Sequence, residues 1–272
     1  MHPIERLRFV ARAQGAPADL LVEESAAALG AFRDDPAGLV AACRRIIDRQ
    51  LECGPLWWLC ARMLCSPDPF AEAREAVTEL RDDPTPRLLA AAFPDGATVV
   101  VVGWPEQSLG ALGRRGDLTV LCVDSGGDAH DLVRRLADLD VVAEEVPTRT
   151  TGTAVAEAAA TGGGGVLLLD ALAVGPDEVL VPAGGRAAAA AARAEGVPTW
   201  VVAGAGRLLP ARMYEALVGR WSDSSDPLGA AQERVPMALV DRVAGTGGVV
   251  EPAEALRRTD CPVAPELFRL AG

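Results

Sequence analysis

The chain has 272 residues, a formal net charge of −12 and a composition that is half hydrophobic, which is enough for one large or two ordinary cores. A charge of this sign opposes binding to a phosphate backbone, so we expect no nucleic-acid partner. All 26 basic residues are arginine. The absence of lysine excludes a lysine Schiff base and a lysine-dependent phosphate-binding loop.

No apolar stretch approaches the roughly 20 residues that span a bilayer, and the first residues do not resemble a signal peptide. We therefore expect a soluble, cytoplasmic protein with no membrane partner. The six cysteines form no C-x-x-C pair, and only two histidines accompany them. These counts favour buried thiols over a metal site, and we expect neither a metal nor a cofactor.

The first part of the chain, residues 1–95, has the periodicity of a helical domain. Asp35-Pro36 and Asp68-Pro69 each provide a capping carboxylate followed by a proline at the first helical position. Apolar residues recur with helical spacing in residues 20–32, 39–51, 56–64 and 70–80. A short helix is predicted over residues 87–92, and Phe93-Pro94-Asp95-Gly96 marks the domain boundary.

Residues 96–272 are expected to form a Rossmann-like α/β domain. Strands that alternate with helices predict a mostly parallel sheet. The predicted strands are 98–102, 118–123, 141–146, 166–169, 197–202 and a last one near 237–241. The predicted helices lie near 106–115, 128–139, 187–194 and 210–218. Residues 179–181 are interpreted as a hairpin edge or loop, and residues 221–226 as a polar loop.

The strand 166–169 ends at Asp170, which directs attention to this carboxylate. In open parallel sheets the ligand site lies beyond the carboxyl ends of the strands. Asp170 and the loop after Val202 are therefore the first candidates for a site. A second interpretation stays open, in which Asp170 only caps a helix or bonds backbone at the end of its strand.

Residues 167–203, LLLDALAVGPDEVLVPAGGRAAAAAARAEGVPTWVVA, resemble a conserved block of one superfamily. It contains the α, β and δ regulatory subunits of translation initiation factor 2B, ribose-1,5-bisphosphate isomerase and methylthioribose-1-phosphate isomerase. The resemblance extends, more weakly, over nearly the whole chain. It implies a helical N-terminal domain, a Rossmann-like C-terminal domain, and a homodimer that pairs through the Rossmann-like domains.

The resemblance also implies site residues. In the isomerases an acid/base pair is formed by an aspartate, which matches Asp170, and a cysteine that follows the first strand. Here that neighbourhood holds no cysteine, Trp104 or a near neighbour takes its place, and Glu106 is the candidate replacement. The remaining candidates are the Gly-Ala motif at Gly15 and Ala16, and Arg186 and Arg207 as phosphate ligands.

Most of the polar groups that the isomerases use are replaced in this sequence. The family's early arginines correspond to Gln14 and to Cys53 or Gly54. We therefore expect a non-catalytic binding or regulatory protein for a phosphorylated sugar or nucleotide. The alternative is an aldose–ketose isomerase, of the ribose-1,5-bisphosphate or methylthioribose-1-phosphate type, with a rebuilt site.

Two further features yield predictions. Thr148 and Arg149 follow a strand and precede a helix, so backbone amides and hydroxyls there could bind an anion, although a capped helix start is the plainer interpretation. Trp221 falls in the predicted polar loop, where an exposed aromatic would mark a dimer interface.

Overall fold

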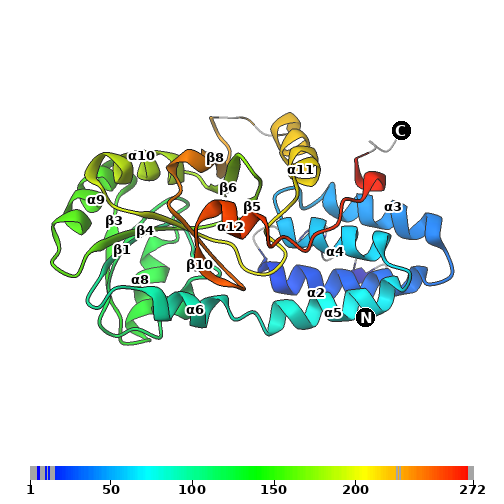
Figure 1. Ribbon diagram of the computed structural model, residues 1–272, viewed down its shortest axis with the longest axis horizontal. Helices are drawn as coiled ribbons and strands as arrows, with labels where there is room; N and C mark the ends of the chain where they lie inside the picture. The colour runs from blue at the N-terminus through cyan, green and yellow to red at the C-terminus, as the bar shows by residue number, and fades with distance from the viewer. Residues whose placement is uncertain are drawn as a thin grey trace.

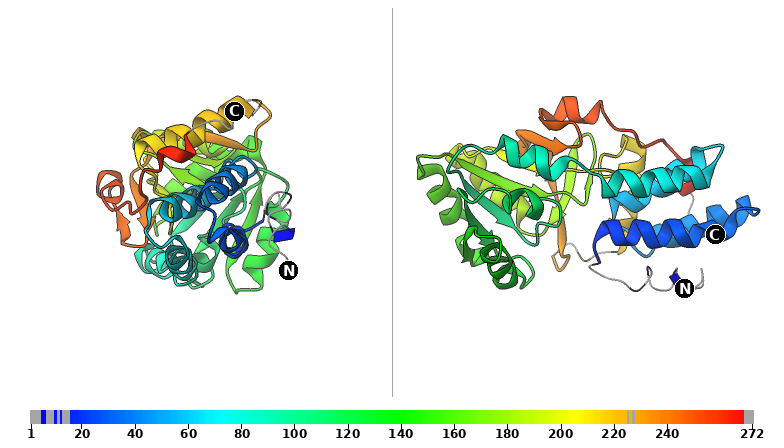
Figure 2. Two further views of the ribbon diagram at one scale, coloured as in Figure 1. Left: turned by 90° about the vertical axis from the view of Figure 1, so that its right-hand side faces the viewer. Right: turned by 90° about the horizontal axis from the view of Figure 1, so that it is seen from below.

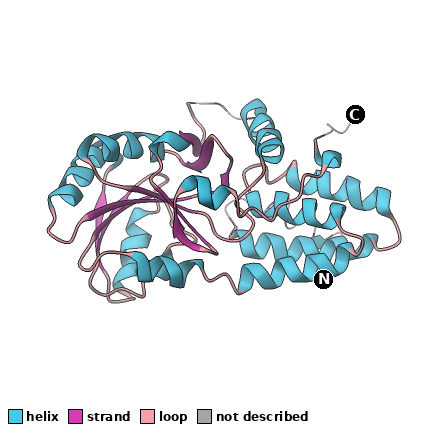
Figure 3. Ribbon diagram, viewed as in Figure 1, coloured by secondary structure: helices cyan, strands magenta, loops and turns pink. Residues whose placement is uncertain are grey.

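A computed structural model describes residues 5–6, 10, 12, 16–224, 226 and 228–268 of the chain. The sheet domain and a layer of helices lie end to end along the longest axis of the molecule (Figures 1 and 2). Figure 3 shows that the strands are confined to one end, and helices α2 to α5 to the other. The helical layer contains α2 (Ala18–Leu29), α3 (Pro36–Ile47), α4 (Gly54–Cys65) and α5 (Pro69–Arg81).

Local sequence signals explain where two of these helices begin. The Asp35 carboxylate accepts a hydrogen bond from the Gly38 amide at the start of α3. The Asp68 carboxylate accepts from the amides of Phe70 and Ala71 at the start of α5. Each aspartate precedes a proline, as predicted, and satisfies amides that lack an intrahelical partner. Helix α4 is the centre of the layer, because nearly all of its residues are buried.

The main sheet has seven strands in the order β10-β9-β7-β4-β1-β2-β3. All neighbours are parallel except β9 and β10. The strands are β1 (Thr98–Val102), β2 (Thr119–Val123), β3 (Val142–Val146), β4 (Gly165–Asp170), β7 (Thr199–Val202), β9 (Arg242–Gly245) and β10 (Gly248–Val250). The chain builds the sheet outward from β1 to β3, then from β4 in the opposite direction. The switch point of this topology therefore lies between β1 and β4, as the mostly parallel prediction requires.

Both faces of this sheet are covered by helices, which explains the continuous apolar strands. Val99 and Val101 of β1 face a core shared with α6 (Thr85–Ala92), α7 (Leu109–Leu112) and α8 (Ala129–Ala137). Val100 and Val102 face the opposite core, shared with α9 (Thr151–Ala160), α10 (Gly185–Glu195) and α12 (Pro252–Leu256). Figure 1 shows the two helix groups on opposite sides of the strands.

A second, antiparallel sheet connects the main sheet to the helical layer. Its order is β5-β6-β8, with β5 (Ala173–Val174), β6 (Glu178–Pro182) and β8 (Gln232–Pro236). Helix α11 (Ala211–Ser224) and the segment around the short 3₁₀ helix Pro265–Leu267 pack in the core of α2 to α5. The C-terminal part of the chain thus completes the N-terminal helical layer. The boundary near residue 95 stays a prediction.

Several sequence-based expectations differ from the structure. The helix expected near 106–115 is only Leu109–Leu112, and residues 179–181 form the central strand β6 rather than an edge or loop. The last strand, expected near 237–241, is replaced by a 3₁₀ turn at Met237–Leu239 between β8 and β9. Among the described residues, no helix combines the length and apolar character that crossing a membrane requires.

Trp221 was expected in an exposed loop, and that expectation is wrong. Helix α11 continues to Ser224, and Trp221 in its last turns is only 8% exposed. Its side chain belongs to the core shared with α2 to α5. The polar residues that follow Trp221 obscured the helical pattern. This tryptophan therefore gives no support for a dimer interface.

We expect Trp221→Ala to lower the free energy of unfolding by about 3–5 kcal/mol, because a large buried side chain would leave a cavity. Trp104→Ala is the matched control, since Trp104 is 39% exposed and its removal should cost less than about 1 kcal/mol. Urea denaturation of both variants, followed by circular dichroism, measures the difference. Equal costs would contradict the placement of Trp221.

Candidate functional site at the switch point

Asp170, the last residue of β4, binds the loop that follows β1. Its Oδ1 accepts a hydrogen bond from the Ser108 hydroxyl at 2.6 Å. Its Oδ2 accepts from the amides of Gln107 at 2.6 Å and Ser108 at 3.1 Å. The side chain is buried, with 7% of the residue exposed. Both carboxylate oxygens thus serve to hold residues 107–108 beside the end of β4.

The Gln107 side chain extends this connection to β7. Its Nε2 donates to the carbonyls of Ala171 and Val202, each at 3.1 Å. Its Oε1 accepts from the Gly204 amide at 2.7 Å. One amide side chain therefore links the residues that follow β1, β4 and β7. The carboxyl ends of three neighbouring strands are fixed relative to one another.

Glu106 and Arg207 form an ion pair at the same end of the sheet. Arg207 Nη2 lies 3.4 Å from Glu106 Oε1, and Arg207 Nε donates to the Ala171 carbonyl at 3.0 Å. Arg207 is only 5% exposed. Glu106 Oε1 also accepts from the amide of Ala18, the first residue of α2, at 2.8 Å. The Glu106 carboxylate therefore occupies the positive end of a helix and neutralises a buried guanidinium.

The start of α4 closes the other side of this region. The Gly54 amide donates to the Leu172 carbonyl at 3.1 Å, and a Cβ on Gly54 would lie 2.5 Å from that oxygen. Only glycine permits this approach. Cys53 precedes it and is buried. Burial raises the pKa of the Cys53 thiol to about 12, although Arg207 lowers it in part, so this thiol is not a ready nucleophile.

The pKa of Asp170 is the result of two opposing effects. Burial raises the pKa of Asp170, while the hydrogen bonds from Ser108 and Gln107 and the charge of Arg207 lower it. Burial prevails, and the pKa lies above its ordinary value. The described part of the chain contains no group of three histidine, cysteine or carboxylate side chains placed to hold a metal ion.

The structure brings several of the predicted site residues together. Asp170, Glu106 and Arg207 lie at the switch point, and Ala16 precedes the α2 start that Glu106 caps. Trp104 lies in the same loop as Glu106, directly after Gly103. Gly15 lies outside the described residues.

The other predicted residues lie elsewhere. Arg186 is exposed at the start of α10, where its amide donates to Glu233. Thr148 and Arg149 follow β3, which β1 and β2 separate from β4. The Thr148 hydroxyl donates to the Asp124 carbonyl, and the Thr151 hydroxyl donates back to the Thr148 carbonyl at 2.7 Å. Both hydroxyls donate to carbonyls, and no side-chain cap accepts from the amides at the start of α9 or of the 3₁₀ turn Thr148–Thr150, so the capped helix start expected here is not formed.

Sequence reasoning missed Gln107, Ser108 and Cys53. Gln107 and Ser108 follow a strand, and a polar pair at the carboxyl end of a parallel strand is the one signal that pointed to them. Nothing in the sequence indicates that their partner is Asp170, 62 and 63 residues away. Cys53 was interpreted as one of several buried thiols, and it is buried.

No known protein family model matches the sequence, and no curated protein matches it. The fold is shared with solved structures at low sequence identity. The translation initiation factor eIF-2B of Pyrococcus horikoshii OT3 is 14% identical, with a TM-score of 0.75 over 93% of this chain and 98% of that chain. The tetrameric eIF2B-beta2-delta2 complex of Chaetomium thermophilum contains a chain that is 15% identical, with a TM-score of 0.74 over 94% of this chain and 92% of that one.

An enzyme has the same fold. The 5-methylthioribose 1-phosphate isomerase of Pyrococcus horikoshii OT3 is 13% identical, with a TM-score of 0.64 over 94% of this chain and 87% of that chain. The expected architecture, a helical layer followed by a Rossmann-like sheet, is therefore confirmed. At these identities the likeness establishes the fold alone, which the eIF2B chains and the isomerase share.

The raised pKa of Asp170 predicts a pH dependence of stability. A native pKa above the unfolded value of 3.8 means that the native state binds this proton more tightly. The stabilisation of the native state by the protonated Asp170 side chain is therefore complete below pH 3.8, and it is lost as the pH rises through the native pKa. We expect the unfolding free energy of the wild type minus that of Asp170→Asn to fall as the pH rises from 4 to 7, by at most about 1.4 kcal/mol per pH unit.

Asp117→Asn is the control of opposite sign. Hydrogen bonds from Arg115 and from the Gly96 amide hold the pKa of Asp117 below its ordinary value. The stabilisation of the native state by the ionised Asp117 side chain is therefore present above pH 3.8, and it is lost as the pH falls through the native pKa. Urea unfolding at several pH values measures both differences. A wild type minus Asp170→Asn difference that is flat or rises between pH 4 and 7 would contradict the assignment.

Proposed function

We propose that this chain is a non-catalytic binding or regulatory protein, whose ligand at the switch point is a phosphorylated sugar or nucleotide. The observation that carries this proposal is the engagement of Asp170. Both of its oxygens accept hydrogen bonds from residues 107–108. An acid/base catalyst must instead reach a proton on the substrate.

The surroundings of Asp170 support the same conclusion. Moving a carbonyl between adjacent carbons requires a second acid or base. Glu106, the candidate for that role, is held by the Ala18 amide and Arg207. The Cys53 thiol is close enough to Arg207 and Glu106 for their charges to affect its pKa, but burial raises that pKa to about 12. Among the described residues at the switch point, the carboxylates of Asp170 and Glu106 are thus both engaged by donors of the protein itself.

The choice of a phosphorylated ligand rests on the groups that surround Glu106. A backbone amide at the start of a twelve-residue helix and a buried guanidinium converge on one carboxylate oxygen. This donor set suits a phosphate as well as a carboxylate. A ligand phosphate would replace the Glu106 carboxylate between α2 and Arg207. Glu106 thus competes with the ligand for this position.

The alternative function is an aldose–ketose isomerase acting on a sugar phosphate. One observation favours it, namely that burial raises the pKa of Asp170, as befits a general acid. In that mechanism Asp170 and Glu106 would exchange protons with adjacent carbons, and Arg207 would hold the phosphate. The mechanism requires that ligand binding first break the hydrogen bonds from Ser108 and Gln107.

We expect Glu106→Gln to bind ribose 5-phosphate or adenosine monophosphate on the order of tenfold more tightly than the wild type, because the competing charge is removed. Glutamine retains an oxygen that can accept from the Ala18 amide, so α2 should remain in place. Glu195→Gln, which removes an exposed carboxylate at the end of α10, is the matched control and should bind as the wild type does. Isothermal titration calorimetry measures all three proteins.

Two results would overturn the proposal. Failure of the wild type and Glu106→Gln to bind any sugar phosphate or nucleoside monophosphate would leave no phosphorylated ligand at the switch point. Formation of a ketose from ribose 1,5-bisphosphate or methylthioribose 1-phosphate, detected by NMR and abolished in Asp170→Asn, would establish the isomerase instead.

We also propose that the chain forms a homodimer. The support is the fold shared with a subunit of a tetrameric complex and with other regulatory subunits. Sedimentation at tens of micromolar should give a species of twice the 28.2 kDa chain mass. A single species of the chain mass at that concentration would contradict the dimer.

A further inference from the structure

A segment without helix or strand, residues 257–264, crosses from the sheet domain to the helical layer (Figure 1). Its residues 259–263 make no backbone–backbone hydrogen bond with any described residue. Side chains hold the segment instead. Asp260 accepts a hydrogen bond from Trp58 Nε1 at 3.2 Å and lies 3.6 Å from Arg62. The segment can therefore shift slightly without breaking a sheet ladder or a helix.

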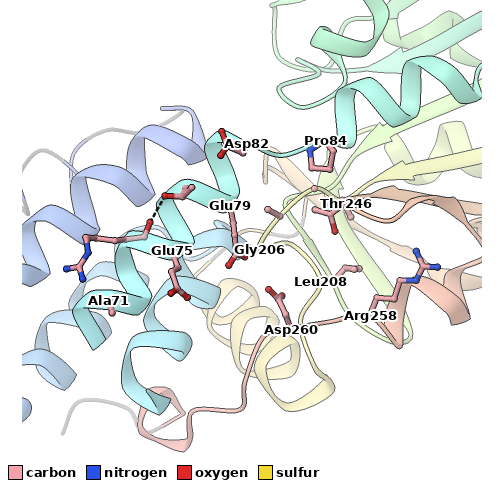
Figure 4. A pocket seen from close by; sticks show the side chains of 15 residues that line it. Ala71, Glu75, Glu79, Asp82, Pro84, Gly206, Leu208, Thr246, Arg258 and Asp260 are labelled. Atoms are coloured by element: carbon pink, nitrogen blue, oxygen red, sulfur yellow. Dashed lines mark hydrogen bonds between the residues drawn. The ribbon is translucent and has the colours of Figure 1, made fainter. Parts of the chain in front are cut away.

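The same segment forms one wall of a cleft of about 730 Å³ beside α5. The other walls include α5 itself and residues 203–206 after β7. Figure 4 shows Asp260 directed toward the same space as Glu75 and Glu79 of α5. A bond that fixes the segment would therefore also fix this wall of the cleft.

Cys65 lies on the face of α4 that the segment follows. Trp58, Arg62 and Cys65 are spaced four and three residues apart, so they share one side of the helix. The first two contact Asp260, and Cys65 Sγ lies 3.6 Å from the carbonyl oxygen of Val263. The segment therefore runs alongside α4 in the same direction as the helix.

Cys261 falls between those two contacts. Its Sγ lies 3.5 Å from the carbonyl oxygen of Pro262, one peptide away from the oxygen that Cys65 contacts. Burial raises the pKa of Cys261, and the charges of Asp260 and Cys65 raise it further, so the two sulfurs lie within electrostatic range of one another. Both thiols are free, and Cys65 is exposed whereas Cys261 is buried.

We propose that Cys65 and Cys261 form a reversible disulfide by exchange with a small disulfide of the glutathione type. The exposed Cys65 thiolate attacks one sulfur of glutathione disulfide, which forms a mixed disulfide and releases one glutathione thiolate. The Cys261 thiolate then attacks the Cys65 sulfur and releases the second glutathione. Two protein thiols are thus oxidised, one glutathione disulfide is reduced, and the two protein protons pass to the two departing thiolates.

The bond would tie the end of α4 to the crossing segment, and so hold the Asp260 wall of the cleft. Partial burial and the charge of Glu266 raise the pKa of Cys65, so the first step is slower than for an unperturbed thiol. The disulfide does not depend on the function proposed for the switch point, and either can fail without the other.

A second pair of thiols provides an internal comparison. The side chains of Cys43 and Cys60 are hydrogen-bonded, and Cys60 Sγ lies 4.0 Å from the Cys43 carbonyl oxygen. Both residues are fully buried. Glutathione disulfide does not reach them in the native state, so this pair should stay reduced although its members are in contact.

The test is incubation of the native protein with glutathione disulfide, followed by alkylation, digestion with trypsin and mass spectrometry without reductant. Because all basic residues are arginine, trypsin places Cys65 in peptide 63–74 and Cys261 in peptide 259–269, each with a single cysteine. The wild type should yield these two peptides joined, and the intact chain should lose the mass of two hydrogen atoms. Dithiothreitol should reverse both changes.

Serine variants separate the two steps. Cys261→Ser should stop at the mixed disulfide and carry glutathione on Cys65. Cys65→Ser, at an exposed position, should form neither the mixed disulfide nor the internal bond. Cys122→Ser, which removes a buried thiol on β2, is the matched control and should form the bond as the wild type does.

Three results for the wild type would overturn the proposal. These are a chain that stays fully reduced, a chain that stops at glutathione on Cys65, and a bond that joins any other pair of peptides, such as those of Cys43 and Cys60. The peptide map of the wild type gives this answer even if Cys261→Ser fails to fold.

Discussion

The hydrogen bonds that Asp170 accepts from residues 107–108 are the constraint on which the switch point depends. Parallel strands leave their carboxyl ends with loops that must be held by something other than the sheet. Here a buried carboxylate on β4 receives two amides and one hydroxyl from the loop after β1. That attachment sets the position of Glu106, the preceding residue, and so the contact between the sheet and α2. Loss of the carboxylate would release all three connections together.

Glu106 shows how one loop joins the two layers of the molecule. Its carboxylate is the partner of both the first amide of α2 and the guanidinium of Arg207. A buried arginine without a nearby anion would be costly, and an uncapped helix start loses a favourable interaction. One side chain meets both requirements. The helical layer is therefore attached to the sheet domain by electrostatic contacts at the carboxyl edge of the parallel strands, where open sheets bind ligands.

Much of the fold was predictable because the signals are local. Continuous apolar runs gave strands β1, β2, β4 and β7, and the Asp-Pro pairs gave the starts of α3 and α5. The end of α11 was not predictable from its own residues. Ser222 and Asp223 read as a loop, yet Trp221 packs into a core built by distant helices. Long-range packing decided that boundary.

The candidate site was predictable only in part. The chain topology places Asp170 at the switch point, and this follows from the strand pattern. Glu106 was considered as an acid/base candidate, and its neighbours in the sequence do not indicate which helix its carboxylate contacts. It caps α2, 88 positions away in sequence. Pairings of this kind depend on tertiary geometry, and a single sequence carries no trace of them.

The two regions at the carboxyl edge differ in how their charges are balanced. At the switch point, Arg207 is paired with Glu106, so an anionic ligand would have to displace the Glu106 carboxylate to reach Arg207. In the cleft beside α5, Arg62 lies within 4.0 Å of Glu75, Glu79 and Asp260, and Arg74 and Arg258 line the same cleft. Gln107 connects these regions, because its side chain bonds both the loop after β4 and Gly204 at the edge of the cleft. A shift of the loop 203–206 would therefore disturb the amide that holds the Asp170 loop.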